Sequence, residues 1–310
     1  MSLALLFPGQ ASQAVGMAVD LYEADAEVKD LFDVADECLG ISLTKLCFEG
    51  PMEELSQTSV TQPAVYVHSV AATRVLTRKG IDPVATAGHS LGEYSALTAA
   101  GVFEFADGLR LVGERGRLMQ EAGTQRPGKM AAIIGLDDDD VVKACEIDVE
   151  GNVVPANFNA PGQVVISGDG PAVEVACKNA EKADAAKVVV LPVSGAFHSP
   201  LMQPAADAMK ALLYEVEFCA PTIPVVTNVT GSAVTDPEEL RRCLIQQITA
   251  PVRWADSIRS LAGAGVDIAA EVGPGSVLRG LVRRIQRGIK VLPAGTVEDI
   301  EETGSKLSRL

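Results

Sequence analysis

A serine flanked by two glycines lies where a strand-like run meets a helix-like run, and this junction constrains the fold more than any other feature. Residues 88–92 read Gly-His-Ser-Leu-Gly, the four residues before them form a short, largely apolar run, and a helical pattern follows from Glu93 to Ala100. In such a context Gly-x-Ser-x-Gly places its serine on a sharp strand-to-helix turn with the hydroxyl exposed. Ser90 is therefore a candidate nucleophile, and an ordinary helix N-cap is the alternative interpretation.

Short apolar runs alternate with longer helical patterns on both sides of this junction. We expect strands at 3–7, 84–88, 224–228 and 268–272. We expect helices at 25–39, 62–79, 91–100, 105–122, after Pro200, at 237–247, at 254–263 and, as a last long helix, at 278–287. Strands that alternate with helices predict an α/β fold with a parallel sheet and helices on both faces.

The middle of the chain has a different order of elements. After a breaker at 124–128, we expect strands at 130–134, 153–157, 163–167 and 187–192, and helices at 138–146 and 171–183. The resulting βαββαβ order is that of a small ferredoxin-like unit. We therefore expect a ferredoxin-like small subdomain over residues 127–191, inserted into a large subdomain made of residues 1–126 and 192–310.

The composition argues against several classes of function. The 310 residues include 26 Lys and Arg against 41 Asp and Glu, a net charge of −15, which disfavours binding to nucleic acid or to an anionic membrane. No apolar run approaches the ~18 residues of a membrane helix. The six cysteines are scattered without metal spacing, which predicts reduced thiols in the cytoplasm. A transit peptide ahead of this sequence would instead allow a plastid or another organelle.

The base that activates Ser90 must be one of three histidines. His68 lies within a helical pattern, and His89 adjoins the serine on a turn where neighbouring side chains point apart. His198 lies in a loop after an expected strand, where catalytic residues often collect. We expect His198 to be the base, although a lone loop histidine often has no function. No acidic residue before it stands out as a triad member, so a neutral group such as a backbone carbonyl would orient its ring.

Arg115 is the most informative charge. Its neighbours three and four positions away in the helical pattern are apolar: Leu111, Val112, Leu118 and Met119. A guanidinium on an apolar face is costly unless it is paired. Two interpretations remain open: a structural role, as a buried ion pair or a snorkelling side chain, and a fork that binds the carboxylate of a substrate.

The turn after the first expected strand, residues 7–13, is placed to aim a backbone N–H at the serine. Together with the N–H of Leu91, such a group would form an oxyanion hole. An ordinary strand-to-helix turn is the alternative interpretation.

These blocks together resemble the malonyl-CoA:acyl-carrier-protein transacylases of fatty-acid synthesis and the acyltransferase domains of polyketide synthases. The resemblance covers nearly the whole chain. It rests on Phe7-Pro-Gly-Gln10, Thr61-Gln-Pro-Ala64, Gly88-His-Ser-Leu-Gly-Glu93, Arg115, Asn159-Ala-Pro-Gly-Gln163, Gly195-Ala-Phe-His198, Gln247 with Pro251-Val-Arg-Trp254, and Glu271-Val-Gly-Pro-Gly275. Ala11 is a departure, because the family usually has Gly there, and an alanine is strained if the position needs a positive φ.

The resemblance implies an α/β-hydrolase-like core and a ping-pong transfer through a malonyl-serine intermediate, catalysed by a Ser–His dyad. It also implies a role for each of eight residues. These are Ser90 as nucleophile, His198 as base, the amides of Gln10 and Leu91 as oxyanion hole, Arg115 as the site of the malonyl carboxylate, the carbonyl of Gln247 as the group that orients His198, and Phe197 and Asn159 as pocket residues.

The implied substrates are malonyl-CoA and an acyl carrier protein that brings the phosphopantetheine thiol, and no permanently bound cofactor or metal is implied. A carrier as acidic as this chain would need a local basic patch for docking. The last expected helix offers one such face: Arg279, Arg283, Arg284 and Arg287. A solvated helix face is the alternative. The alternative functions are a serine esterase or thioesterase with the same elbow, and a non-catalytic docking module.

Overall fold

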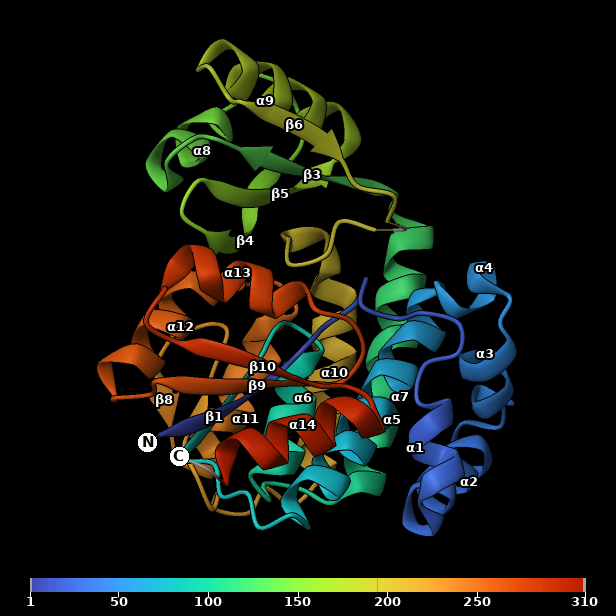
Figure 1. Ribbon diagram of the computed structural model, residues 1–310. Helices are drawn as coiled ribbons and strands as arrows, with labels where there is room; N and C mark the ends of the chain where they lie inside the picture. Colours follow the sequence, from blue (N-terminus) through green and yellow to red (C-terminus); the bar gives the residue numbers. More distant parts are fainter. Residues whose placement is uncertain (1, 194, 309–310) are drawn as a thin grey trace.

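A six-stranded, mainly parallel sheet forms the centre of the computed structural model, which describes residues 2–193 and 195–308 (Figure 1). The spatial order is β10-β9-β1-β2-β7-β8, and all neighbours run parallel except β7 and β8. The strands are β1 (Leu3–Phe7), β2 (Ala85–Gly88), β7 (Val225–Val226), β8 (Ala233–Val234), β9 (Ile268–Val272) and β10 (Lys290–Ala294). The parallel strands therefore end at one edge of the sheet, where α/β proteins commonly place their sites.

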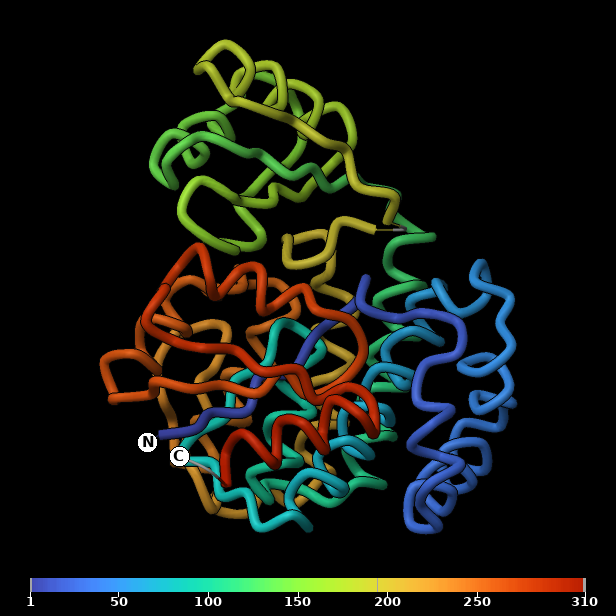
Figure 2. The backbone as a smooth tube through the Cα atoms, in the orientation of Figure 1, coloured from blue at the N-terminus to red at the C-terminus, as the bar shows by residue number. Residues whose placement is uncertain are grey.

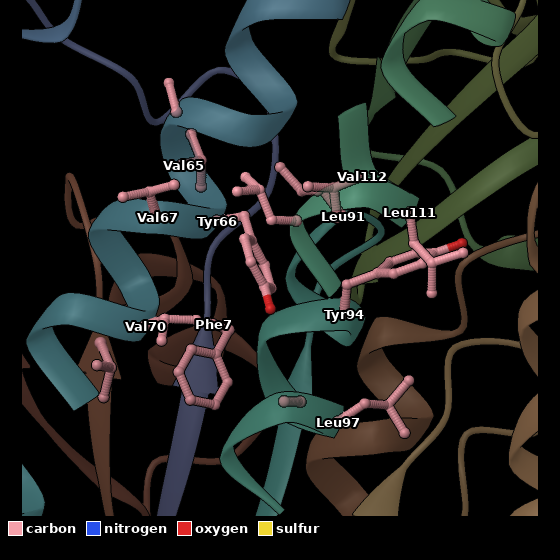
Figure 3. Close-up of a cluster of buried hydrophobic side chains, with 14 of the residues drawn as sticks. Phe7, Val65, Tyr66, Val67, Val70, Leu91, Tyr94, Leu97, Leu111 and Val112 are labelled. Carbon is pink, nitrogen blue, oxygen red and sulfur yellow. The ribbon is translucent and has the colours of Figure 1, made fainter. Parts of the chain in front are cut away.

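Helices cover both faces of this sheet because its strands are apolar on both sides. Leu5 and Phe7 of β1 pack into one core, and Ala4 and Leu6 pack into another. The first core is shared with α5 (Thr58–Thr77), α6 (Gly92–Ala99) and α7 (Phe105–Gln125), as Figure 3 shows. The second lies under α12 (Trp254–Gly263) and α13 (Val277–Ile285).

The remaining helices of the large body are α1 (Val19–Ala24), α2 (Ala26–Leu39), α3 (Leu43–Glu49), α4 (Met52–Leu55), α10 (Gln203–Glu215), α11 (Pro237–Gln247) and α14 (Val297–Leu307), with a short 3₁₀ turn at Pro200–Met202.

A second, four-stranded antiparallel sheet lies over this body, in the spatial order β4-β5-β3-β6 (Figure 1). Its elements are β3 (Gly128–Ile134), α8 (Asp138–Ala144), β4 (Val153–Ala160), β5 (Gln163–Asp169), α9 (Gly170–Lys182) and β6 (Lys187–Val190). Ala131 and Ile133 face α8 and α9, whereas Met130 and Ala132 face the large body. The chain enters along β3 and leaves along the neighbouring β6, so the two connections lie side by side (Figure 2).

The strands and helices predicted for the middle of the chain are confirmed in their order, with ends shifted by up to three residues. The predicted helices at 237–247 and 254–263 and the strands at 3–7 and 268–272 have the observed bounds. These segments carry strong local signals, namely a proline or tryptophan at the helix start and a continuous apolar run in the strand.

The prediction of a last long helix at 278–287 is wrong at its end. Helix α13 ends at Ile285, and the chain continues into β10 and α14. Strand β10 contains Pro293, and a proline within an apolar run argues against a strand in the sequence. The strand forms nevertheless because it lies at the edge of the sheet, where proline is tolerated. The short helices α1, α3 and α4 were also not predicted, because they have only four to seven residues and thus too few turns to show a period.

Two further findings concern the described residues. No helix within 2–193 and 195–308 is long and apolar enough to cross a membrane. All six cysteines lie in this part of the chain and are free thiols.

Candidate active site

Ser90 lies at the turn between β2 and α6, in the left-handed region of the backbone with φ 50°. Two close approaches require the flanking glycines. A Cβ on Gly88 would lie 1.9 Å from the backbone of Gly92, and a Cβ on Gly92 would lie 2.1 Å from the carbonyl oxygen of Phe7. The strained serine is thus the outcome of a turn packed tightly against β1, as in a nucleophile elbow.

Ser90 Oγ lies 2.8 Å from Nε2 of His198, the distance of a hydrogen bond. The other ring nitrogen, Nδ1, lies 2.8 Å from the carbonyl oxygen of Gln247 and 3.2 Å from that of Ala250. A carbonyl can only accept, so Nδ1 carries the proton and Nε2 is free to accept the serine proton. Burial, and next the nearby charge of Arg115, lower the pKa of His198 to about 3, which keeps the ring neutral.

Arg115 of α7 is 1% exposed and points at the nucleophile. Its guanidinium donates to Ser90 Oγ at 3.1 Å, to Oε1 of Gln62 at 2.7 Å and to Oε1 of Gln247 at 2.9 Å. It also lies over the ring of Tyr94, 5.5 Å from the centroid. Burial lowers the pKa of Arg115. All three hydrogen-bond acceptors are neutral, so this buried cation has no carboxylate partner among the described residues, and the predicted alternative of a structural ion pair does not hold.

A cavity of about 250 Å³ opens onto these groups. The sequence-predicted residues Gln10, Leu91, Phe197 and Asn159 all line it, together with Ser90, Arg115 and His198. Its other walls are mainly apolar and come from α7, from the small sheet, from the segment after β6 and from α13: Met119, Met130, Val165, Leu191, Val193, Val277 and Leu281. Gln247 lies behind the cavity rather than in its lining, and it contacts His198 and Arg115 from there.

Ala11, where the resemblance predicts a glycine, has φ 78°. This is the left-handed region that disfavours any residue with a Cβ. The strain expected at this position is therefore present, and it lies one residue from Gln10 in the turn that faces Ser90.

Three residues of the site received no role from the sequence. Asn228, just after β7, accepts from the Ser90 N–H at 2.6 Å and donates to the carbonyl of Gly88 at 2.6 Å. Gln62 lies within one of the blocks that carry the resemblance, and Glu93 ends another, but neither has a chemistry that local pattern reveals. Asn228 had no signal beyond its place at the end of an expected strand.

Glu93 is fully buried at the start of α6. One carboxylate oxygen, Oε2, accepts from Nε2 of Gln247 at 2.7 Å and from the N–H of Asn228 at 3.1 Å. The other, Oε1, has no hydrogen-bond partner in the described structure. Burial raises the pKa of Glu93 to about 7, against the lowering effect of these hydrogen bonds and of Arg115.

The four arginines of the proposed docking face are exposed and line a surface hollow together with Lys290. They do not share one helix face, however. Arg284 turns towards the small sheet and donates to Gln163 and to the carbonyl of Pro161, and Arg287 lies beyond the end of α13. Among residues 2–193 and 195–308, no group of three or more His, Cys, Asp or Glu side chains could hold a metal ion.

The chain is similar to known proteins over nearly its whole length. Residues 4–302 match the family described as acyl transferase domain. The chain is 49% identical over 284 residues to the malonyl CoA-acyl carrier protein transacylase of Escherichia coli (strain K12), covering 91% of this chain and 92% of the relative. It is 44% identical over 301 residues to the protein of that name from Bacillus subtilis (strain 168), covering 96% and 95%. A solved structure of a type II polyketide synthase acyl-carrier protein in complex with its malonyl-transacylase matches with a TM-score of 0.94 at 42% identity, covering 99% of this chain and 100% of that one.

Proposed function

The chain belongs to the acyl transferase domain family, and we propose that it moves a malonyl group from coenzyme A to the phosphopantetheine thiol of an acyl carrier protein. The observation that carries this proposal is the buried guanidinium of Arg115, which has only neutral partners and donates to the nucleophile at 3.1 Å. A carboxylate two bonds from the acyl carbonyl would reach it while the carbonyl lies at Ser90. Arginine binds such a group with two parallel hydrogen bonds.

The first half-reaction acylates the enzyme. Nε2 of His198 takes the Ser90 proton while Oγ attacks the thioester carbonyl. The N–H groups of Gln10 and Leu91 stabilise the oxyanion, a contribution worth about 10²–10³ in rate for a single donor. When the intermediate collapses, the C–S bond breaks, the imidazolium protonates the coenzyme A sulfur, and malonyl-Ser90 remains.

The second half-reaction repeats these steps with a new nucleophile. His198 takes the proton of the phosphopantetheine thiol, whose sulfur attacks the ester carbonyl. Ser90 Oγ leaves and regains its proton from the imidazolium. The Gln247 carbonyl holds the ring in one tautomer throughout, since Nδ1 donates to it at 2.8 Å. A covalent intermediate between two substrates predicts ping-pong kinetics.

Arg115 also explains selectivity for the acyl group. An acetyl group would leave the guanidinium without its carboxylate, and sites that bind a polar group reject analogues lacking it by ~10⁴ or more. Phe197 narrows the same cavity, so a branched acyl group such as methylmalonyl should fit poorly.

The finer architecture belongs to the same proposal. The parallel sheet, elbow and dyad support an α/β-hydrolase-like large subdomain of residues 1–126 and 192–310. The βαββαβ order and antiparallel pairing of residues 127–191 support a ferredoxin-like small subdomain. Of the four arginines predicted to dock the carrier protein, Arg284 is bonded to the small sheet; the proposed docking surface is therefore Arg279, Arg283 and Arg287, together with Lys290. Loss of carrier-dependent turnover on charge reversal at these positions, with acylation by malonyl-CoA retained, is the expected result.

Intact-mass measurement after brief mixing with malonyl-CoA tests the function. The wild type should gain one malonyl group, Ser90→Ala should gain none, and holo acyl carrier protein should discharge the adduct. In Arg115→Ala, the ratio of malonyl to acetyl labelling should fall by at least ~10². Steady release of coenzyme A without an adduct would instead identify a thioesterase, and neither adduct nor release would identify a docking module.

A further inference from the structure

A buried carboxylate and a buried guanidinium lie in the same cluster behind the nucleophile, yet they do not pair with each other. Glu93 and Arg115 are 0% and 1% exposed. The side chain of Gln247 bridges the two groups: it donates to Glu93 through Nε2 at 2.7 Å and accepts from Arg115 through Oε1 at 2.9 Å. Opposite charges in a desolvated site attract strongly, so a glutamine that keeps them apart calls for a physical reason.

The carboxylate fixes which way the amide of Gln247 points. When Glu93 is ionised its carboxylate has no donor, so only the NH₂ end of the amide can then face it. The oxygen end must then face Arg115, as observed. The same NH₂ group also donates to the Ser90 carbonyl at 3.0 Å. The orientation of one amide therefore links the elbow, the carboxylate and the arginine.

A second glutamine presents its oxygen to the same guanidinium. Gln62 Oε1 accepts from Arg115 at 2.7 Å, while its Nε2 lies 3.5 Å from the sulfur of Met119. Arg115 is thus held by two amide oxygens and one hydroxyl. These acceptors orient a guanidinium without neutralising it, and they bind it less tightly than a carboxylate would.

We propose that Glu93 and the Gln247 side chain are positioning residues that hold Arg115 oriented but unneutralised, so that its charge is reserved for the carboxylate of the acyl substrate. When ionised, Glu93 supplies a compensating negative charge on the far side of Gln247, and the Gln247 side chain keeps the carboxylate from pairing directly with the guanidinium. The inference rests on the proposed function, since it concerns the acyl-carboxylate site of that reaction.

The substitution Gln247→Glu tests this proposal directly. It puts a carboxylate where the amide oxygen now accepts from Arg115, and it leaves the backbone carbonyl that holds His198 in place. Single-turnover labelling by malonyl-CoA and by acetyl-CoA is measured by intact mass. The malonyl-to-acetyl ratio should fall about 100-fold, because the new carboxylate occupies the guanidinium that the malonyl carboxylate needs.

Two comparisons separate this effect from general disruption. Gln246→Glu adds the same charge to the neighbouring, exposed position of α11 and should leave the ratio unchanged. In an Arg115→Ala background, Gln247→Glu should not lower the ratio further, because the two changes act through one interaction. An unchanged ratio in the single variant, or an undiminished effect without Arg115, would overturn the proposal.

A second variant decides the matter if Gln247→Glu does not fold. Glu93→Gln keeps the side-chain shape but lets either end of the facing amide point at Arg115. The malonyl-to-acetyl ratio should fall about threefold to tenfold; an unchanged ratio would exclude Glu93 from this role. Failure of the proposed function is distinguishable, since the wild type would then form no malonyl adduct at all.

Discussion

The two sheets contribute to the cavity in different ways. The large parallel sheet brings the reactive groups together, because Gln10, Ser90 and Asn228 follow β1, β2 and β7 at the same edge. The small antiparallel sheet supplies part of the apolar wall, through Met130 and Val165, and two polar side chains of β4, Asn157 and Asn159. Parallel strands converge their carboxyl ends on one place, so loops from distant parts of the chain can cooperate there. An antiparallel sheet instead presents one broad face, which suits it to cover a site rather than to assemble one.

The largest effect should come from a group held by the large body. His198→Ala removes the base and should lower the rate of Ser90 acylation about 10³-fold, measured as malonyl adduct formation by rapid quenching. Asn159→Ala in the small sheet removes a hydrogen bond to His89 of 2.8 Å and should cost only a few-fold. Similar losses of acylation rate in the two variants would contradict the inference that the large body carries the reactive groups and the small sheet only covers the site.

The pH dependence of acylation should separate the base from its electrostatic surroundings. His198 is faced by Arg115 of α7 and by His89 of the elbow, and Glu93 of α6 lies behind Gln247. Because its pKa is lowered to about 3, the ring should stay neutral and active down to the lowest pH at which the protein is folded. Arg115→Gln removes a cation that disfavours the imidazolium, so the pKa of His198 should rise and the rate should begin to fall at a higher pH than in the wild type. The measurement is the rate of reaction with a neutral ester such as p-nitrophenyl acetate. A rate profile that matches the wild type, or that falls only at lower pH, would show that Arg115 does not lower the pKa of His198.

A smaller kinetic effect is expected behind the elbow. Asn228→Ala removes the acceptor of the Ser90 N–H and the donor to the Gly88 carbonyl. The strained backbone at Ser90 then lacks the two hydrogen bonds that hold it in place. We expect acylation to slow about tenfold and the free energy of unfolding to fall by about 1–3 kcal/mol, because buried polar groups lose their partners. Asn157→Ala in β4, which also lines the cavity, is the matched change in the other sheet and should slow acylation less.

The smallest effect should be one of stability. Ala11 has φ 78° and is exposed, so Ala11→Gly relieves strain at the cost of some unfolded-state entropy and should stabilise the protein by about 0.5–1 kcal/mol. Urea denaturation measures the change. Ala14→Gly, at an exposed position without a positive φ, should be neutral or destabilising. Equal effects of the two changes would mean that the backbone at Ala11 is not strained.

Local signals predicted most of the fold. The continuous apolar run of β1, the Gly88-x-Ser90-x-Gly92 junction and the helix starts at Pro237 and Trp254 each depend on residues close in sequence, and they appear where expected. The elements that were missed have weak local signals. Strand β10 contains a proline and lies at a sheet edge, where the partner strand rather than the local pattern decides the conformation.

The residue types needed for the chemistry were visible in the sequence: a serine between glycines, a histidine in a loop, and an arginine among apolar neighbours. Their joint geometry was not. Ser90 and His198 are 108 positions apart, and Gln247 is 132 positions from Arg115, so no local pattern could bring them within hydrogen-bond distance. Only the tertiary structure could show that Arg115 has no carboxylate partner among residues 2–193 and 195–308, because the amide of Gln247 lies between it and Glu93. Local sequence determines which backbone conformations are low in free energy. The pairing of buried polar groups depends instead on which distant segments the packed core brings together.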